Sequence, residues 1–233
     1  MKVKASNTAL LVFSLSAKAE AERKPLFGKE KISASIGLYH QLINKTKRLA
    51  KESGLDVFWF DEKNQVGNSF GEKYANSFQH IFDKGYNNVI SIGNDSPDLS
   101  SEILADAIQK LNHQDLVLGP AQDGGAYLIG LSSKVFDFNQ FKALSWTHKN
   151  LFEDLQNYAI KASVAFTTLG TLLDLDQKAD LYTLTRNSVL TELVRYILKC
   201  LRSVFYPPQL KLELSYTTPT IQGFQLRGPP TYC

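Results

Sequence analysis

The sequence predicts an α/β fold, in which a mostly parallel, mixed sheet carries helices on both of its faces. Short β-rich runs alternate with helical patterns along most of the chain. The run at residues 88–93 is apolar enough for a strand buried on both faces. The chain has 233 residues, 43% of them hydrophobic, so it can bury one good-sized core. One domain with a C-terminal extension is therefore expected.

The first half of the chain is expected to form three strands and two helices. The predicted strands cover residues 8–16, 56–60 and 88–93. Apolar side chains recur at helical spacing over residues 35–52 and 72–84, which predicts a helix in each range. Such an order is typical of βαβ units, whose strands pair in parallel.

The N-terminal apolar run has a second interpretation, as a secretory signal. Lys2 and Lys4 precede it, and Ala17-Lys18-Ala19 is similar to a small-residue cleavage site. The strand is favoured because the run is short and Lys18 interrupts the would-be site. No stretch approaches the roughly 18 apolar residues that a membrane span requires.

The second half continues the alternation. Ser100 is placed to cap a helix whose inner face includes Leu104 and Leu111. Further strands are expected at residues 116–118, 126–131 and 163–168, and a further helix at residues 149–161. In sheets of this kind a ligand binds at the carboxyl ends of the strands.

Composition excludes several classes of function. The formal charge of +3, from 26 basic and 23 acidic residues, is too balanced to indicate nucleic acid or an acidic membrane as a partner. The two cysteines, Cys200 and Cys233, provide neither a disulfide framework nor a CxxC metal site, so a cytoplasmic protein is expected. The four histidines lack metal-ligand spacing, which leaves zinc hydrolysis without support.

Acidic turns follow two of the predicted strands. In the first, GNDSPDLS, Asp95 emerges from a buried strand, and such a carboxylate can bind Mg²⁺ while phosphate oxygens and waters complete the coordination. Gly93 precedes it and is expected to contact the ligand. The alternative is that Asp95 and Asp98 are turn and helix-capping residues.

The second acidic turn is Asp123-Gly124-Gly125, within LGPAQDGGAYLIGL. Its glycines permit positive φ and a close approach of the backbone to a ligand. The alternative is a plain hairpin turn, because Asp-Gly between apolar strands is a strong hairpin signal.

Four segments carry a family resemblance: IGNDSPDL, LGPAQDGGAYLIGL, LSWTHKNLF and LLDLDQKADL, in that order. Over about residues 7–185 the chain resembles the DUF2064 family of glycosyltransferase-A-like proteins. The resemblance implies a Rossmann-like nucleotide-diphospho-sugar transferase (GT-A) fold, related to the cofactor nucleotidyltransferases. It also implies a nucleoside triphosphate or nucleotide sugar as ligand, and Mg²⁺ or Mn²⁺ held by Asp95 and Asp123, which would be the catalytic residues.

The loop after the first strand departs from the family pattern. Relatives carry a Lys, a Pro-x-x-Gly turn and a Lys-Thr-Arg triplet there, whereas residues 14–26, SLSAKAEAERKPL, contain no glycine. A phosphate cradle of backbone N–H groups is therefore weakened. Lys24 is expected to contact phosphate, and Lys18, Arg23 and Lys29 could add charge; the alternative is a solvated loop.

Further site residues are expected by the same resemblance. Gly71 is a candidate backbone contact or helix-start residue, and Lys73 stands where relatives often have an arginine. Trp146 would border the acceptor pocket, although a lone tryptophan is more often a core residue. Asp174 is a possible contributor to the metal site, whereas Asp176 is better placed to be the N-cap of a helix that runs toward Arg186.

Residues 186–233 form the expected extension beyond a domain of residues 1–185. Val189, Leu193, Ile197 and Leu201 fall on one apolar helical stripe, which must be covered by the domain itself or by a second subunit of a homodimer. The leading functional hypothesis is a metal-dependent nucleotidyl- or glycosyltransferase with an undefined acceptor. The alternative is a non-catalytic nucleotide-binding or scaffold protein on the same fold.

Overall fold

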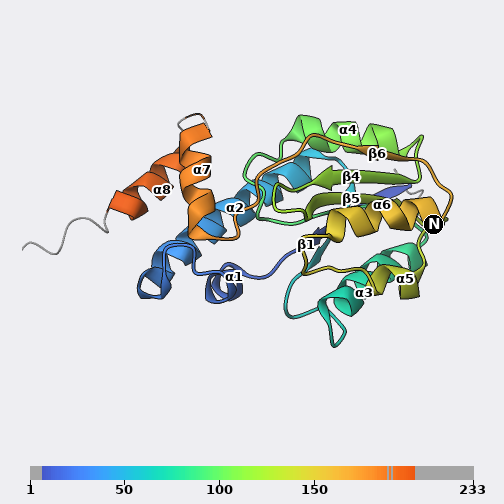
Figure 1. Ribbon diagram of the computed structural model, residues 1–233, viewed down its shortest axis with the longest axis horizontal. Coiled ribbons are helices and arrows are strands. Elements are labelled where there is room, and N and C mark those ends of the chain that lie inside the picture. Colours follow the sequence, from blue (N-terminus) through green and yellow to red (C-terminus); the bar gives the residue numbers. More distant parts are fainter. Residues whose placement is uncertain (1–6, 188, 190, 203–233) are drawn as a thin grey trace, which may run out of the picture.

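A six-stranded mixed sheet forms the centre of the protein, and helices cover both of its faces (Figure 1). The computed structural model describes residues 7–187, 189 and 191–202. The strands are β1 (Thr8–Phe13), β2 (Asp56–Phe60), β3 (Asn88–Ile92), β4 (Leu116–Pro120), β5 (Ala126–Ser132) and β6 (Phe166–Thr168). Their order is β2-β1-β3-β5-β4-β6. Only β5 runs antiparallel to its neighbours among these strands, which confirms the mostly parallel, mixed sheet.

Each predicted helix is present, with shifted ends. The helices are α1 (Ala17–Arg23), the 3-10 helix η1 (Lys29–Lys31), α2 (Ile32–Glu52), α3 (Phe70–Asp83), α4 (Ser101–Leu111), α5 (Phe138–Lys142), α6 (Leu151–Lys161), α7 (Lys178–Asn187) and α8 (Glu192–Arg202). Ser100 caps α4 as predicted, because its Oγ accepts the N–H of Ile103 at 3.3 Å. The unpredicted elements α1, η1 and α5 have seven, three and five residues, too few to show an apolar period.

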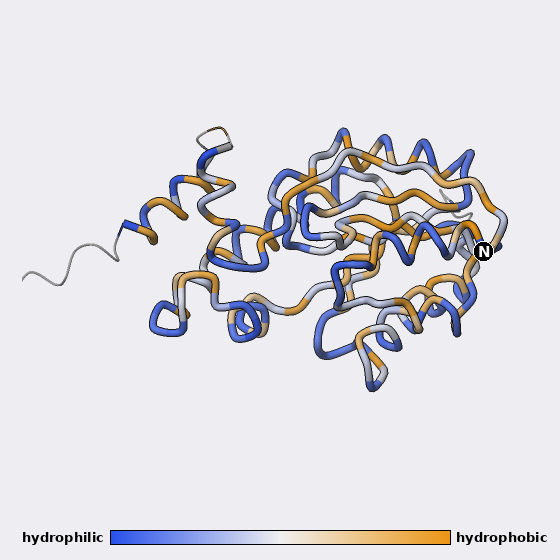
Figure 2. The backbone as a smooth tube through the Cα atoms, in the orientation of Figure 1, coloured by the Kyte–Doolittle hydropathy of each residue, from blue (hydrophilic) through white to orange (hydrophobic). Residues whose placement is uncertain are grey.

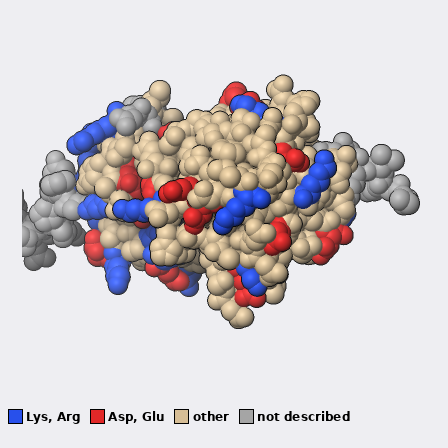
Figure 3. Space-filling model, turned by 45° about the vertical axis from the view of Figure 1, so that its right-hand side comes forward, with Lys and Arg blue, Asp and Glu red and all other residues tan. Residues whose placement is uncertain are grey.

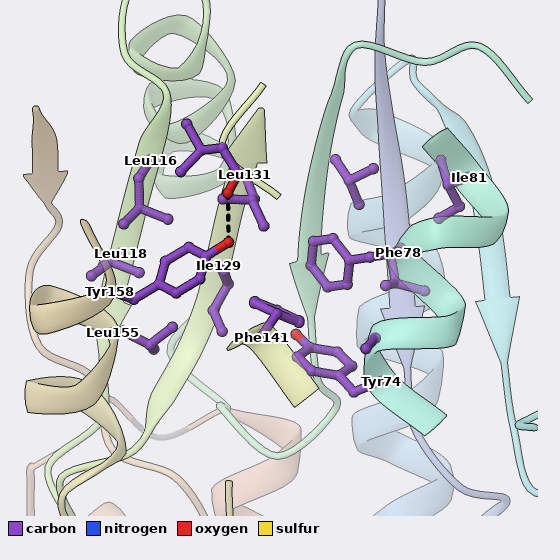
Figure 4. Packing of buried hydrophobic residues seen from close by; sticks show 14 of the residues in the cluster. Tyr74, Phe78, Ile81, Leu116, Leu118, Ile129, Leu131, Phe141, Leu155 and Tyr158 are labelled. Carbon is purple, nitrogen blue, oxygen red and sulfur yellow. Dashed lines mark hydrogen bonds between the residues drawn. The ribbon is translucent and has the colours of Figure 1, made fainter. Parts of the chain in front are cut away.

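The sheet is buried on both faces, and β1 shows how. Ala9 and Leu11 point into one core, Leu10 and Val12 point into the other, and all four are fully buried. Figure 2 shows the hydrophobic colour concentrated along the strands. The first core lies under α3, α5 and α6, where rings such as those of Tyr74 and Phe141 pack together (Figure 4). The second lies under α4 and the C-terminal end of α2.

A third core lies beside the sheet, mainly among helices and the loops next to them. It joins α1 and the first half of α2 to α7 and α8, which form one end of the molecule in Figure 1. Ile197 and Leu201 of the predicted stripe are buried there. Val189 is 84% exposed and lies between α7 and α8, so its expected place on the stripe is wrong. The expected boundary between residues 185 and 186 falls inside α7.

Two further observations concern the charge of the surface and the length of the helices. On the face seen in Figure 3, basic and acidic side chains are interspersed, as the balanced composition predicts. In the part of the chain that the structure describes, no helix has the length and apolar character needed to cross a membrane.

Candidate functional site

A cavity of about 570 Å³ opens at the carboxyl ends of β1, β3 and β4. These strands run in the same direction, so their ends meet at one edge of the sheet. The cavity is lined by Phe13 at the end of β1 and by Ser14 and Leu15 after it, by Gly93, Asn94 and Asp95 after β3, by Asp123, Gly125 and Ala126 of the hairpin, and by residues from α1 and from the loops before α3, α6 and α7. The structure thus brings the two predicted acidic turns to one cavity.

Asp95 lies in this cavity beside a fixed cation. The Lys24 ammonium is 3.4 Å from Asp95 Oδ2, and it also donates to Asp176 Oδ1. Burial alone would lower the pKa of Lys24, but Asp95 and then Asp176 outweigh it and raise that pKa. A Cβ on Gly93 would come within 2.7 Å of Asp95 Oδ1, so the glycine leaves room for this carboxylate. Lys24 therefore reaches the cavity, where it is bound to carboxylates.

Asp174 adds a third carboxyl group beside Asp95. Ser96 Oγ donates to Asp174 Oδ1, and both Asp174 and Asp176 line the cavity. Burial, followed by repulsion from Asp95, raises the pKa of Asp174 to about 8. The folded protein therefore favours the protonated form of Asp174.

The pKa of Asp174 predicts a pH dependence of stability. Because the folded protein binds this proton more tightly than the unfolded chain, the stabilising contribution is full below pH about 4 and is lost as the pH rises toward about 8. Asp174→Asn keeps an acceptor for Ser96 without the charge. We expect the free energy of unfolding of the variant, relative to that of the wild type, to increase by at least about 1 kcal/mol when the pH is raised from 4 to 8. Denaturant titrations at both pH values measure this difference, and a constant difference would contradict the prediction.

The expected capping role of Asp176 is wrong. Helix α7 begins at Lys178, and the carboxylate of Asp180 accepts the N–H groups of Asp176 and Gln177 at 2.9 and 2.8 Å. A carboxylate from inside the helix therefore closes this end, as in the acidic half of a capping box. The side chain of Asp176 is left to bind Lys24.

The Asp123-Gly124-Gly125 turn is a hairpin between β4 and β5, as its alternative interpretation predicted. Asp123 Oδ1 accepts the N–H of Gly125 at 2.9 Å, and Gly124 has a φ of 91°. Asp123 and Gly125 both line the cavity. Gly124 instead packs against the backbone of Lys149, because a Cβ there would lie 2.0 Å from the Lys149 carbonyl oxygen. The hairpin geometry is what brings Asp123 to the cavity.

Aromatic rings form the opposite wall. Phe13, Phe70, Tyr74 and Trp146 line the cavity, and the rings of Tyr74 and Trp146 are centred 4.8 Å apart. The indole N–H of Trp146 donates to the Phe141 carbonyl at 2.9 Å, which fixes the ring. Gly71 lies behind this wall, because a Cβ there would meet the Lys142 carbonyl oxygen at 2.2 Å and Trp146 Cδ1 at 2.7 Å. Gly71 therefore allows α3 to approach Trp146, and it does not line the cavity.

Two buried polar groups at the cavity have no hydrogen-bond partner among the described residues. Ser14 Oγ and Asn94 Nδ2 are these groups, and the residues are 4% and 5% exposed. Buried polar atoms are nearly always hydrogen-bonded, since an unpaired one costs about 1–3 kcal/mol. Both residues line the cavity, so the two groups lie next to the place where a ligand would bind. Neither group was expected from the sequence, although Ser14 directly follows β1 and Asn94 directly follows the glycine at the end of β3.

The remaining charged residues differ in whether they line the cavity and in whether they already have a partner of opposite charge. Lys73 and Lys149 line the cavity, and neither has an ion pair within 4.0 Å in the described part of the chain. Arg23 lines it too, but is bound to Glu20. Asp98 is exposed and lines a separate cavity near Lys45, so it does not reach the same site as Asp95.

The donor chemistry of the cavity fits a hard divalent cation. Within the described ranges, no three His, Cys, Asp or Glu side chains gather closely enough to hold a metal on their own. Mg²⁺ does not need such a cage, because it is usually bound by one or two carboxylates together with phosphate oxygens and waters. Asp95 and Asp123 supply such oxygens. The pKa of Asp174 is raised first by burial and then by repulsion from Asp95, and a cation would relieve the second of these causes. The residues therefore fit a metal that arrives with a phosphate ligand.

Comparisons with known proteins agree with this fold. A family model described as "Uncharacterized protein conserved in bacteria (DUF2064)" matches residues 46–148, which include Asp95, Asp123 and Trp146. The crystal structure of a "putative nucleotide-diphospho-sugar transferase" from Desulfovibrio desulfuricans G20 is 23% identical, with a TM-score of 0.74, and the match covers 85% of this chain and 98% of that one. The resemblance to DUF2064 and the nucleotide-diphospho-sugar transferase fold are thereby confirmed.

Weaker structural matches include Rv0371c from Mycobacterium tuberculosis H37Rv. It is 13% identical, with a TM-score of 0.49, over 78% of this chain and 98% of that one. Its complex with manganese is 13% identical, with a TM-score of 0.43, over 78% of this chain and 99% of that one. A search of curated proteins found no match.

Proposed function

We propose that the protein is a metal-dependent transferase that moves a nucleotidyl or glycosyl group from a nucleoside triphosphate or a nucleotide sugar. One observation carries this proposal: a single cavity combines the Asp95 and Asp123 carboxylates with the unpartnered, buried polar groups of Ser14 and Asn94. Carboxylates suit a metal, and the two polar groups suit a polar ligand that replaces water.

Each wall of the cavity has a role in this proposal. Asp95 and Asp123 would hold Mg²⁺ or Mn²⁺, which neutralises charge on a transferring phosphoryl group or a leaving diphosphate. Lys73 lines the cavity from α3 and would meet the phosphates. Phe70 and Trp146 offer ring faces and edges against which a base or sugar packs. Catalysis by these residues is mainly positioning and charge neutralisation.

A second candidate is a nucleotide-binding protein without turnover. The observation that favours it is the loop after β1, where the N–H groups of Leu15 and Ser16 already bond the carboxylates of Glu20 and Glu62. These carboxylates occupy backbone donors that could otherwise contribute to binding a phosphate group. For either candidate we propose a cytoplasmic location, from the absence of a cysteine framework in the sequence.

Thermal unfolding with a panel of ligands tests the proposal. The panel contains nucleoside mono-, di- and triphosphates and nucleotide sugars, each with Mg²⁺, Mn²⁺ or EDTA. We expect the melting temperature to rise for at least one ligand class with metal and not with EDTA, because a ligand that binds the folded state stabilises it. Product formation with a panel of sugar and phosphate acceptors would support the transferase. Binding without any product would favour the second candidate, and no shift with any ligand would exclude both.

A further inference from the structure

The backbone N–H groups of the loop after β1 bind carboxylates of the chain itself, beside the cavity that Leu15 lines. The Leu15 N–H donates to Glu20 Oε1 at 3.2 Å, and the Ser16 N–H donates to Glu62 Oε2 at 2.8 Å. Backbone N–H groups that follow a strand in this way are a common binding place for phosphate. In this protein the chain's own carboxylates take them.

Glu20 is the fixed member of this pair. Its side chain is 4% exposed and lines the cavity, whereas that of Glu62 is largely in solvent. Arg23 donates from its guanidinium to Glu20 Oε2 at 2.8 Å. The positive charge of Arg23 is therefore matched by Glu20 before any ligand arrives.

Among the described residues, few positive charges at the cavity are left unpaired and available to a ligand. Lys24 is shared by Asp95 and Asp176, and a divalent metal would be matched by Asp95 and Asp123. Lys73 and Lys149 are the lining lysines without an ion pair in the described part of the chain. Two positive charges balance a diphosphate diester, whereas a free triphosphate carries roughly four negative charges at neutral pH.

We propose that Glu20 is an internal anion that keeps a triphosphate tail out of the loop end of the cavity. It is a specificity-determining residue that makes the site prefer a short phosphate chain, as in nucleoside mono- and diphosphates and the diphosphate esters of sugars. This inference rests on the proposed function and narrows the class of substrate from which the nucleotidyl or glycosyl group is transferred. The physical cause is that Glu20 neutralises the guanidinium of Arg23 and occupies the Leu15 N–H, so neither donor is left to offset the charge of a further phosphate group.

Removing the charge of Glu20 tests the inference. Glu20→Gln keeps an acceptor for the Leu15 N–H and loses the charge. Dissociation constants are measured by calorimetry for the mono-, di- and triphosphate of one nucleoside, with Mn²⁺ present. We expect the variant to strengthen triphosphate binding about tenfold relative to monophosphate binding. The wild type is expected to bind the diphosphate more tightly than the triphosphate.

A matched control lies two residues away on the same helix. Glu22→Gln makes the same change of charge at a side chain that is 61% exposed and pairs with Lys18 at 3.9 Å. It should leave the ratio of triphosphate to monophosphate affinity within about twofold, because solvent screens an exposed charge. An equal effect of both variants would show a general effect of net charge and would overturn the role of Glu20.

A second variant acts in the opposite direction. Arg23→Gln removes the partner of Glu20, so its negative charge is exposed to the ligand and triphosphate binding should weaken further relative to monophosphate. This variant decides the question if Glu20→Gln does not fold. An unchanged ratio in the folded variants overturns the inference while leaving the proposed function intact. Failure of every nucleotide to bind the wild type would overturn both.

Discussion

Replacing Asp95 by asparagine is expected to weaken metal-dependent nucleotide binding about 100-fold, or about 2.7 kcal/mol. The amide has no charge, so a hard divalent cation loses one of its two carboxylate ligands at the cavity. The same change releases Lys24 from one of its two carboxylate partners. Without metal, nucleotide binding should therefore stay equal or become tighter. Calorimetric titrations with Mn²⁺ and with EDTA measure the two effects separately.

Asp98 provides the matched control for Asp95. It lies three residues further on, is exposed, and lines a different cavity. Asp98→Asn makes the same chemical change and should alter metal-dependent binding by less than about twofold, as is usual for a screened surface charge. Equal losses in the two variants, or the same loss for Asp95→Asn with and without Mn²⁺, would contradict a metal role for Asp95.

Replacing Gly124 by alanine is expected to destabilise the protein by about 3 kcal/mol or more. Its φ of 91° is unfavourable for an alanine, and the new Cβ would lie 2.0 Å from the carbonyl oxygen of Lys149. That oxygen belongs to the backbone, so the hairpin and the start of α6 must move apart. Equilibrium unfolding in urea measures the loss of free energy. Because the hairpin carries Asp123, ligand binding should weaken as well.

Gly54 separates the two causes of this loss. Its φ is 67°, but a Cβ added at that position would have no atom within 4 Å outside its immediate chain neighbours. Gly54→Ala therefore tests the backbone conformation alone, with an expected cost of about 1 kcal/mol. If both variants lost the same stability, close packing between the hairpin and α6 would not be the cause.

The strands and long helices could be predicted from the sequence because their signals are local. In residues 35–52 and 72–84, apolar side chains recur about once in each turn of a helix, and this spacing predicted α2 and α3. The cap at Ser100 depends on an N–H three residues away. The acidic turns were predicted at the cavity for a similar reason, since parallel strands present their carboxyl ends at one edge.

The partners within the cavity could not be predicted in this way. Lys24 reaches Asp95 and Asp176, which are 71 and 152 residues away along the chain, so no local pattern contains the contact. Glu20 lies in a charged stretch that is typical of solvated loops, yet it is buried. Gly71 was expected near the ligand, and only the packing of Lys142 and Trp146 against α3 shows that it serves close approach.

The sequence by itself determined the α/β class, the alternation of strands and helices, and the edge of the sheet where Asp95 and Asp123 meet. These depend on side-chain periodicity and on chain direction, which are properties of neighbouring residues. The tertiary structure decided which charges are already paired, which polar groups lack a partner, and where the hairpin touches α6. Those properties depend on burial and on distances between remote segments, and these exist only once the three cores are packed.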